Sequence, residues 1–279
     1  MFTYLNPTVR QRLIADGKLI RINERGETLA PDQPAPDSGL AINILGPIPL
    51  PIRLGDLEIQ TRWYATVRST ELAKVEELAA ELSRHGGQRL FSMLASSMAV
   101  NSVLAIGDGE RSEDPLVRVH SSCLTGDVFG SQRCECGPQF VSALRRIHED
   151  PRGGMLIYMS GHEGRGIGLW AKAATYLLQD AGENTYEANR SLGLPDDSRD
   201  FSDAAALLHY FVRGQPFRLL TNNPKKLADL GAFGLRHITP VRHVTGVNPW
   251  NTRYLAAKRD WGHALSASDL GLPDREGEA

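Results

Sequence analysis

The sequence predicts an α/β fold class: a layered α/β/α domain with a mostly parallel or mixed sheet, plus an N-terminal extension and a β-rich segment. Two observations predict it. From residue 116 onward, short apolar segments of strand character alternate with amphipathic segments of roughly 10–15 residues, the pattern of helices that cover a parallel sheet. Between residues 50 and 66, apolar and polar residues alternate loosely, which favours strands.

The N-terminal part of the chain is expected to be peripheral. Residues 1–45 form an extension in this prediction, with a short helix over 7–18 and a proline-rich, polar linker over 30–39. An amphipathic helix is expected over 71–84, because its apolar residues recur on one face and a Gly-Gly pair follows it. The apolar segment 90–109 fits a strand or a buried helix, and a strand is favoured near its end.

The second half of the chain alternates between strands and helices. Strands are expected at 116–121, 153–160 and 217–221, and helices at 138–150, 168–182, 201–214 and 224–234. The polar residues 266–279 are expected to form a frayed C-terminal tail. These elements leave room for one large α/β domain between the extension and the tail.

Composition and charge exclude several classes of function. The 279 residues carry a formal net charge of −2 at pH 7, which gives no electrostatic signal for nucleic acid or an anionic membrane. No apolar run approaches the roughly 20 residues that a membrane span needs. The N-terminus lacks a basic start followed by an apolar stretch, so no signal peptide is expected. We therefore expect a cytoplasmic protein with no nucleic-acid and no membrane partner.

All three cysteines lie in one short segment, at Cys123, Cys134 and Cys136. An odd number argues against a disulfide framework, whereas three thiolates spaced in this way can converge on one metal ion. Three protein ligands leave a position for water, as in catalytic zinc sites. Two alternatives stay open at this point: reduced, buried cysteines without a metal, or a closed structural zinc site with His120 or His162 as the fourth ligand.

Two loops at the ends of expected strands are candidates for binding an anion. The glycines of 161–169 (GHEGRGIGL) let backbone N–H groups approach a ligand, and Arg165 adds a charged fork. The segment 221–226 (TNNPKK) begins a helix, where Lys225 or Lys226 could reach a phosphate. Both follow expected parallel strands, where open α/β sheets bind ligands. In isolation, a structural turn and a well-capped helix with solvated lysines are the favoured explanations; the convergence of both loops at strand ends raises the binding interpretation.

Three further side chains are candidates with an ordinary alternative. Asp197 and Arg199, in the segment DDSRDF, could act as a proton carrier and as an electrostatic stabiliser, or could form a surface ion pair. Tyr176 lies among leucines of an expected helix, a position more typical of a core residue. Residue pattern alone favours the ordinary interpretation for all three.

Five motifs in order resemble the GTP cyclohydrolase II family. RVHSSCLTGDVFGSQRCECGPQ is similar to the zinc motif of that family, and GHEGRGIGL, YLLQDAGENTYEAN, LGLPDDSRDF and LLTNNPKK follow in register. The resemblance covers roughly residues 116–265, with a weaker echo at the LGDLEI segment. It assigns residues 46–265 to a GTP cyclohydrolase II-like catalytic domain.

The resemblance implies roles for individual residues. The zinc ligands would be Cys123, Cys134 and Cys136, and the catalytic residues would be Asp197 as proton acceptor, Arg199 at the α-phosphate and Tyr176 beside the opening ring. The positions that contact GTP would be Arg118, Val119, His120, Ser121, Ser122, Gln139, Glu163, Gly164, Arg165, Thr185, Thr221 and Lys226. A guanidinium stays protonated and makes a poor nucleophile, so the role of Arg199 is left open.

The resemblance also implies a reaction, cofactors and partners. GTP would be hydrolysed to a diamino-ribosylamino-pyrimidinone 5′-phosphate, with release of formate and pyrophosphate, at the entry to riboflavin biosynthesis. One Zn²⁺ per chain would activate the attacking water, and Mg²⁺ would accompany the triphosphate. GTP is the expected substrate, and a homodimer is the expected assembly.

Three features depart from the family pattern. Ser122 stands where glutamate is usual, His162 replaces a common glutamine, and the segment 66–111 is an insertion. These departures leave two rival hypotheses. One is a paralogue in secondary metabolism or nucleobase catabolism that yields a formylated or phosphate-retaining product. The other is a non-catalytic GTP-binding regulator in which the zinc is structural.

Overall fold

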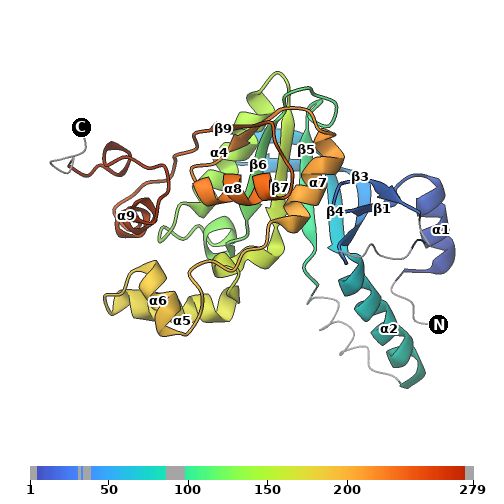
Figure 1. The fold of residues 1–279 in the computed structure, drawn as a ribbon, viewed down its shortest axis with the longest axis horizontal. Helices are drawn as coiled ribbons and strands as arrows, with labels where there is room; N and C mark the ends of the chain where they lie inside the picture. The colour runs from blue at the N-terminus through green and yellow to red at the C-terminus, as the bar shows by residue number, and fades with distance from the viewer. Residues whose placement is uncertain (1–4, 31–32, 34–38, 86–97, 274–279) are drawn as a thin grey trace.

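One large sheet runs through the molecule and carries helices on both faces (Figure 1). The computed structural model describes residues 5–30, 33, 39–85 and 98–273. Within these residues, nine strands pair in the order β2-β1-β3-β4-β5-β7-β6-β8-β9. The predicted fold class, a layered α/β structure on a mixed sheet, is confirmed.

The sheet has an antiparallel half and a parallel half. The antiparallel half consists of β1 (Leu19–Asn23), β2 (Thr28–Leu29), β3 (Ala41–Leu54), β4 (Leu57–Arg68) and β5 (Asn101–Ile106). The parallel half consists of β6 (Leu116–Ser121), β7 (Gly154–Met159), β8 (Phe217–Leu220) and β9 (Ile238–Val241). β5 pairs antiparallel with β7, so the two halves form one continuous sheet.

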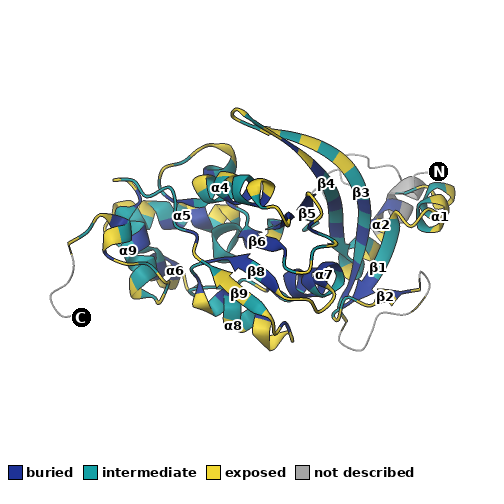
Figure 2. Ribbon diagram, turned by 90° about the horizontal axis from the view of Figure 1, so that it is seen from above, coloured by how far each residue is buried: buried dark blue, intermediate teal, exposed yellow. Residues whose placement is uncertain are grey.

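The helices are spread along the whole length of the chain. They are α1 (Pro7–Ala15), α2 (Ser69–His85), α4 (Cys136–Glu149), α5 (Gly168–Asp180), α6 (Thr185–Ser191), α7 (Ser202–Val212), α8 (Pro224–Ala232) and α9 (Thr252–Asp260), with short turns η1 (Leu124–Val128), η2 (Ser160–Arg165) and η3 (Ser268–Leu270). α1 and α9 lie at opposite ends of the molecule (Figures 1 and 2). Among the helices of the described chain, none is long and apolar enough to cross a lipid bilayer.

The two faces of the sheet bury separate apolar clusters. On one face, Leu207 of α7 belongs to the same cluster as Val117 of β6. On the other face, Leu144 of α4 belongs to a cluster with Leu116 of β6. Successive strand residues point to opposite faces, so one strand supplies both cores. Figure 2 shows buried residues along the central strands and exposed residues at the tip of the β3–β4 hairpin.

The long β3–β4 hairpin contains three prolines, at Pro47, Pro49 and Pro51. β1 pairs with β3 only along Ala41–Leu45, so beyond that point β3 has a free edge among the described residues. Proline is tolerated there because its missing N–H removes no partner from a neighbouring strand. The strands predicted within 50–66 are therefore present, and the hairpin extends beyond that range at both ends.

Most of the other predicted elements are confirmed near their expected places. The three strands predicted from residue 116 onward are β6, β7 and β8, and the four helices are α4, α5, α7 and α8. The predicted N-terminal helix is α1, and the helix predicted over 71–84 is α2. The strand favoured near the end of 90–109 is β5, whereas 90–97 lies outside the described residues, as do most of 30–39 and the end of the tail. η3 forms a short turn within that tail, and β1 was not predicted.

Candidate active site

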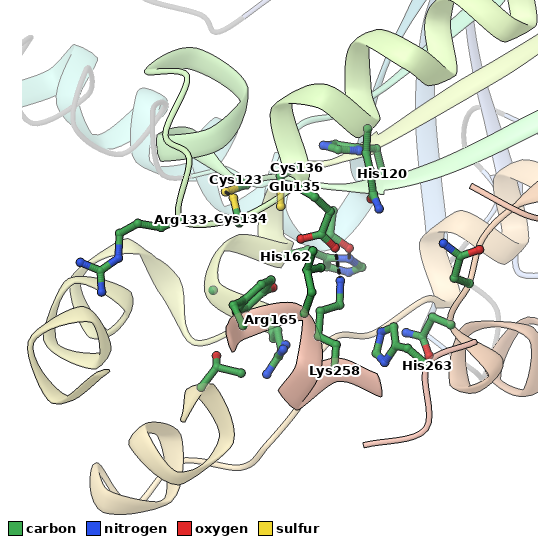
Figure 3. A pocket seen from close by; sticks show the side chains of 18 of the residues that line it. His120, Cys123, Arg133, Cys134, Glu135, Cys136, His162, Arg165, Lys258 and His263 are labelled. Atoms are coloured by element: carbon green, nitrogen blue, oxygen red, sulfur yellow. Dashed lines mark hydrogen bonds and ion pairs between the residues drawn. The ribbon is translucent and has the colours of Figure 1, made fainter. Parts of the chain in front are cut away.

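A pocket opens where the parallel strands β6, β7 and β8 end (Figure 3). The carboxyl ends of parallel strands meet at one edge of a sheet, and the loops that follow them commonly build a ligand site. Here these loops begin at Ser122, Ser160 and Thr221. Side chains from α5, α6 and α9 complete the lining.

The three cysteine thiols converge in this pocket. The Sγ atoms of Cys123 and Cys134 are 3.7 Å apart, and all three sulfurs, including that of Cys136, lie within 4.8 Å of one another. Gly126 leaves room for them, since a Cβ at this position would meet Cys134 Sγ at 2.9 Å and Cys123 Sγ at 3.1 Å. The loop therefore holds three sulfur donors around one point.

This donor set fits a borderline-soft divalent metal such as zinc. Hydrogen bonds from the neighbouring thiols lower the pKa of Cys123, which favours the thiolate that a metal binds. Within the described ranges, no histidine or carboxylate joins the three-sulfur group. The alternative fourth ligands are engaged elsewhere: Nε2 of His120 lies 3.1 Å from Asp127, and Nε2 of His162 lies 2.9 Å from a backbone carbonyl. The geometry thus offers three protein ligands.

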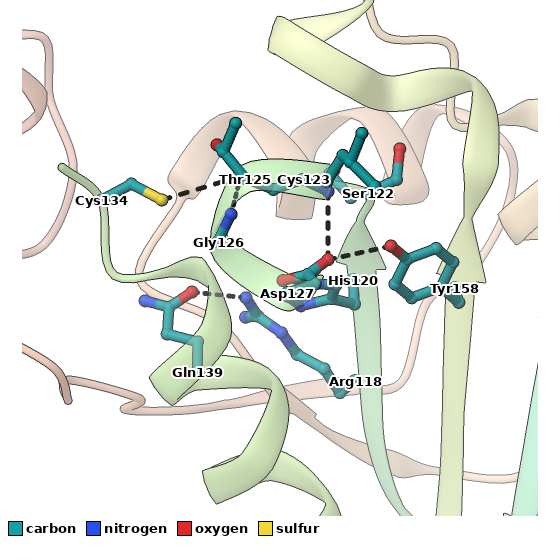
Figure 4. Close-up of polar contacts among 12 residues, drawn as sticks. Arg118, His120, Ser122, Cys123, Thr125, Gly126, Asp127, Cys134, Gln139 and Tyr158 are labelled. Carbon is teal, nitrogen blue, oxygen red and sulfur yellow. Dashed lines mark hydrogen bonds and ion pairs between the residues drawn. The ribbon is translucent and has the colours of Figure 1, made fainter. Parts of the chain in front are cut away.

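Asp127 stabilises the loop that carries the three cysteines, residues 123–136, which is called the cysteine loop below (Figure 4). Its carboxylate accepts hydrogen bonds from the backbone N–H of Cys123 at 3.0 Å and from the hydroxyl of Tyr158 at 2.9 Å. His120 Nε2 lies 3.1 Å from both carboxylate oxygens, and burial lowers the pKa of His120, so the neutral ring donates its Nε2–H to them. Partners of this kind orient the residues that bind a metal.

Positive charge is concentrated and buried around the pocket. Arg118 and Lys226 are only 7% and 4% exposed, and both line the pocket together with Arg199. Burial and the charges of the two arginines lower the pKa of Lys226 well below its ordinary value. Its amine donates to the carbonyl of Val119 at 2.7 Å. Cations crowded together in a low dielectric favour an anionic ligand.

Arg165 adds two unused donors to the same pocket. Its φ of 63° lies in the left-handed region, between two glycines that also have positive φ. Its guanidinium lies 4.1 Å from the centroid of the Tyr186 ring. Both Nη atoms are buried and have no hydrogen-bond partner in the described part of the chain. Buried donors normally have acceptors, so a ligand is expected to supply them.

Glu163 and Tyr176 reach the cysteine loop from two other elements. Oε2 of Glu163 accepts the backbone N–H of Leu124 at 2.7 Å, and the hydroxyl of Tyr176 lies 3.2 Å from Oγ1 of Thr125. Lys172 of α5 lies one helical turn before Tyr176, and its amine forms an ion pair with Glu163 at 2.6 Å. These contacts attach η2 and α5 to the cysteine loop.

The segment after β9 forms a further wall of the pocket. The side chain of Asn222 donates to the carbonyl of His243 at 2.6 Å and accepts its N–H at 2.9 Å. Lys258 of α9 forms an ion pair with Glu135, which lies between two of the cysteines (Figure 3). His263 also lines the pocket, and burial lowers its pKa to about 3. The C-terminal segment therefore contacts both the loop after β8 and the cysteine loop.

Most of the residues singled out from the sequence line this one pocket. They are Arg118, His120, Ser121, Ser122, Cys123, Cys134, Cys136, Gln139, Gly164, Arg165, Tyr176, Thr185, Arg199, Thr221 and Lys226. Val119, Glu163 and Asp197 do not line it: Val119 is buried in the core, Glu163 holds Leu124, and Asp197 is paired with Arg199. Ser122 lines the pocket and donates its hydroxyl to the backbone carbonyl of Ser160 at 2.9 Å.

Several residues that shape the site were not predicted from the sequence. Asp127 stands in a glycine-containing segment that resembles an ordinary turn, and Lys258 and His263 follow a long stretch without a strong motif. Lys172 did carry a signal: it is a lone charge in the apolar helix LWAKAATYLL. A charge in such a helix is rarely buried unless it has a partner, which makes it a candidate for a specific contact.

Fold and site together define an α/β protein with a candidate metal centre inside a pocket that is also lined by buried cationic side chains. The profile of the GTP cyclohydrolase II family matches residues 76–242, which is more than half of the chain. The chain belongs to the GTP cyclohydrolase II family, and the resemblance inferred from its motifs is confirmed.

The curated relatives of this chain are riboflavin biosynthesis proteins. The riboflavin biosynthesis protein RibBA of Salinispora arenicola is 46% identical over 208 residues, covering 73% of this chain and 49% of that protein. RibBA of Mycobacteroides abscessus is 51% identical over 164 residues, covering 58% of this chain and 38% of that protein. The chain spans about half the length, or less, of these relatives.

Proposed function

We propose that this chain is a zinc-dependent GTP cyclohydrolase II. It would hydrolyse GTP to a diamino-ribosylamino-pyrimidinone 5′-phosphate and release formate and pyrophosphate. The observation that carries the proposal is the convergence of three thiols and several buried cations in one pocket. Membership of the family supports GTP as the substrate, and the names of the relatives support a place in riboflavin biosynthesis.

The side chains of the pocket divide the work by their chemistry. Arg118, Arg199 and Lys226 supply positive charge for the polyphosphate, and this charge would stabilise the negative charge that develops as pyrophosphate leaves. The unpaired donors of Arg165 would bind further anionic oxygens. Bound zinc supplies Lewis acidity and lowers the pKa of a coordinated water. Tyr176 contacts Thr125 of the cysteine loop through its hydroxyl, and its ring would orient the purine.

Several finer assignments belong to the same proposal. Zinc would be bound by the three cysteines, one ion per chain, and Mg²⁺ would accompany the triphosphate. The protein would act in the cytoplasm as a homodimer, without nucleic-acid or membrane partners. Residues 1–45 would form an extension, 46–265 the catalytic domain and 266–279 a tail. Gln139, Thr185 and Thr221 line the pocket and would contact GTP together with the cations.

The proposal is tested by incubating the protein with GTP, zinc and magnesium while formate, pyrophosphate and product mass are followed together. Equal release of formate and pyrophosphate is expected. Cys134→Ser should lose metal and formate release, because one sulfur donor is gone. Gln132→Ala is a matched control, since this side chain is exposed on the same loop and does not line the pocket.

The other outcomes separate the rival hypotheses. A product that keeps its formyl group or all of its phosphates would identify a paralogue with a shortened reaction. Tight binding of GTP without formate or pyrophosphate would identify a regulator. Formate release by a metal-free Cys134→Ser variant would contradict the role given to the metal.

A further inference from the structure

We propose that Lys172 is a positioning residue of the metal centre. Its ammonium group holds the Cys123 sulfur and the Glu163 carboxylate in place, and it tunes how strongly that sulfur donates to the metal. The inference rests on the metal site of the proposed function. It adds a residue outside the three ligands that controls metal affinity and the electronic character of the site.

The ammonium group of Lys172 has three acceptors at hydrogen-bonding distance. Nζ lies 2.6 Å from Oε1 of Glu163, 3.0 Å from Oγ1 of Thr125 and 3.1 Å from Sγ of Cys123. An ammonium group has three donors and no acceptor, so each donor has one partner. No donor is left for a substrate, although the residue lines the pocket. Lys172 therefore supports the cysteine loop, whereas the unpaired donors of Arg165 remain available to a ligand.

The position of Lys172 in the fold makes this contact set specific. Its side chain is only 9% exposed, and that of Glu163 is 14% exposed. A lysine is rarely buried to this extent unless its charge is compensated, and removal of one partner leaves an uncompensated charge. The compensation here comes from a carboxylate and from a sulfur that becomes a thiolate when a metal binds. The charge of Lys172 is thus compensated in part by the cysteine loop, through the sulfur of Cys123.

The same contacts join three elements around the cysteines. The second oxygen of Glu163 accepts the N–H of Leu124, the residue after Cys123. Thr125, which receives one donor of Lys172, also lies 3.2 Å from the hydroxyl of Tyr176. Lys172 consequently links η1, η2 and α5 at a single atom. Its loss would release Cys123 from two sides.

A hydrogen bond to a metal-bound thiolate has a predictable electronic effect. The N–H group withdraws charge from the sulfur, so the sulfur donates less to the metal. The ammonium charge also offsets the net negative charge of three thiolates around a divalent ion. Outer partners of metal ligands are commonly worth 10–100-fold in metal affinity. Replacing Lys172 would make the sulfur a stronger donor, but it would also release Cys123 and leave the charges of Glu163 and the thiolates uncompensated. We expect the second effect to be the larger, so that zinc binding weakens by a factor of this size.

The test compares three variants of the full chain with the wild type. Lys172→Met keeps the apolar stem and loses both donor and charge, whereas Lys172→Gln keeps an N–H donor and loses the charge. Lys74→Met, at an exposed position of α2, is the control. Zinc affinity is measured by competition with a chromophoric chelator. The sulfur-to-cobalt charge-transfer band of the cobalt-substituted protein is recorded as a second readout, independent of activity.

The proposal predicts a graded response. Lys172→Met should bind zinc about 10–100-fold more weakly than the wild type, and its charge-transfer band should move to lower energy because the sulfur holds its electrons less tightly. Lys172→Gln should fall between the two in both measurements. Lys74→Met should match the wild type.

Three results would decide against it or against its premise. Wild-type zinc affinity together with an unchanged cobalt band in Lys172→Met would overturn the inference. If circular dichroism shows that Lys172→Met does not fold, Lys172→Gln decides, and wild-type values in that variant would overturn it equally. A wild-type protein that binds no zinc would refute the proposed metal site, which is a different failure.

Discussion

Arg199 and Asp197 are joined by two parallel hydrogen bonds, from Nε to Oδ1 at 2.9 Å and from Nη2 to Oδ2 at 2.6 Å. Burial alone would raise the pKa of Asp197, but Arg199 lowers it below its ordinary value. A carboxylate engaged in this way accepts a proton poorly. In this structure Asp197 therefore orients Arg199 toward the pocket, and a role as proton acceptor would require the pair to open.

Replacing Asp197 should destabilise the protein more than the loss of an exposed ion pair would. The side chains of Arg199 and Asp197 are 12% and 2% exposed, so Asp197→Asn leaves a buried arginine without its counter-ion. We expect a loss of about 3 kcal/mol in the free energy of unfolding, measured by urea titration at neutral pH.

Asp196→Asn is the matched control, because its partner Arg190 is 62% exposed. This surface pair should contribute less than about 1 kcal/mol. Equal losses in the two variants would show that the Asp197 pair is as weak as a surface one.

His243 should make the protein less stable as the solution becomes acidic. Burial lowers the pKa of His243 to about 3, from a model-peptide value of 6.5. The unfolded chain therefore takes up a proton between these two values while the folded chain does not, so stability is present above pH 6.5 and is lost as pH falls. Between pH 7 and pH 5, this one residue should remove about 2 kcal/mol.

The measurement is urea unfolding at these two pH values in wild type and His243→Gln. The variant should lose about 2 kcal/mol less than the wild type over the interval. His148→Gln is the control, since His148 is exposed at the end of α4 and should leave the difference unchanged. An unchanged difference in His243→Gln as well would mean that His243 is not held neutral in the fold.

Gly126→Ala should damage the metal centre without straining the backbone. The new Cβ would lie 2.9 Å from Cys134 Sγ and 3.1 Å from Cys123 Sγ, so at least one sulfur must move. A displaced ligand should lower zinc affinity at least about tenfold, as measured by chelator competition. Gly231→Ala in α8 is the control, because nothing lies within 4 Å of a Cβ there. Equal zinc affinity in the two variants would refute the observed packing of the loop.

Lys258 and Glu135 should be energetically coupled. Glu135 is 3% exposed and its Oε2 has no partner in the described residues, so Lys258→Met leaves a buried carboxylate uncompensated. We expect a loss of about 3 kcal/mol in the free energy of unfolding. Adding Glu135→Gln should restore part of it, with a coupling of at least about 1 kcal/mol in the double-mutant cycle.

The pair Lys225 and Asp229, one turn apart on α8, is a suitable comparison for this cycle. Their side chains are 39% and 27% exposed, and a coupling of about 0.5 kcal/mol or less is expected. A coupling energy of zero in the Lys258–Glu135 cycle would show that other contacts hold α9 against the cysteine loop.

The sequence predicted the layered fold and the convergence of the three cysteines because both depend on local pattern. The alternation of apolar segments after residue 116 reflects which residues face the helices, and the C-x-C spacing is short enough to bring two sulfurs together. β1 escaped prediction because it is defined by its partner: Leu19–Asn23 becomes a strand by pairing with Ala41–Leu45.

The residues that support the site depend on contacts that sequence spacing does not encode. Lys172 meets Glu163 nine positions away and Cys123 49 positions away, and only the packing of α5 against the loop brings the three together. Lys258 and Glu135 are separated by 123 positions. The position of Asp197 behind Arg199, outside the pocket lining, likewise follows from the folded loop and from no feature of the motif.

X-ray absorption at the zinc edge shows whether the three cysteines bind a metal ion. Protein purified with zinc is expected to hold one ion surrounded by three sulfurs at ~2.3 Å and one lighter atom, oxygen or nitrogen. Cys134→Ser should lose one sulfur neighbour or the ion altogether. A wild-type spectrum without zinc, or with no sulfur among the nearest neighbours of the ion, would rule out a zinc centre built by these cysteines.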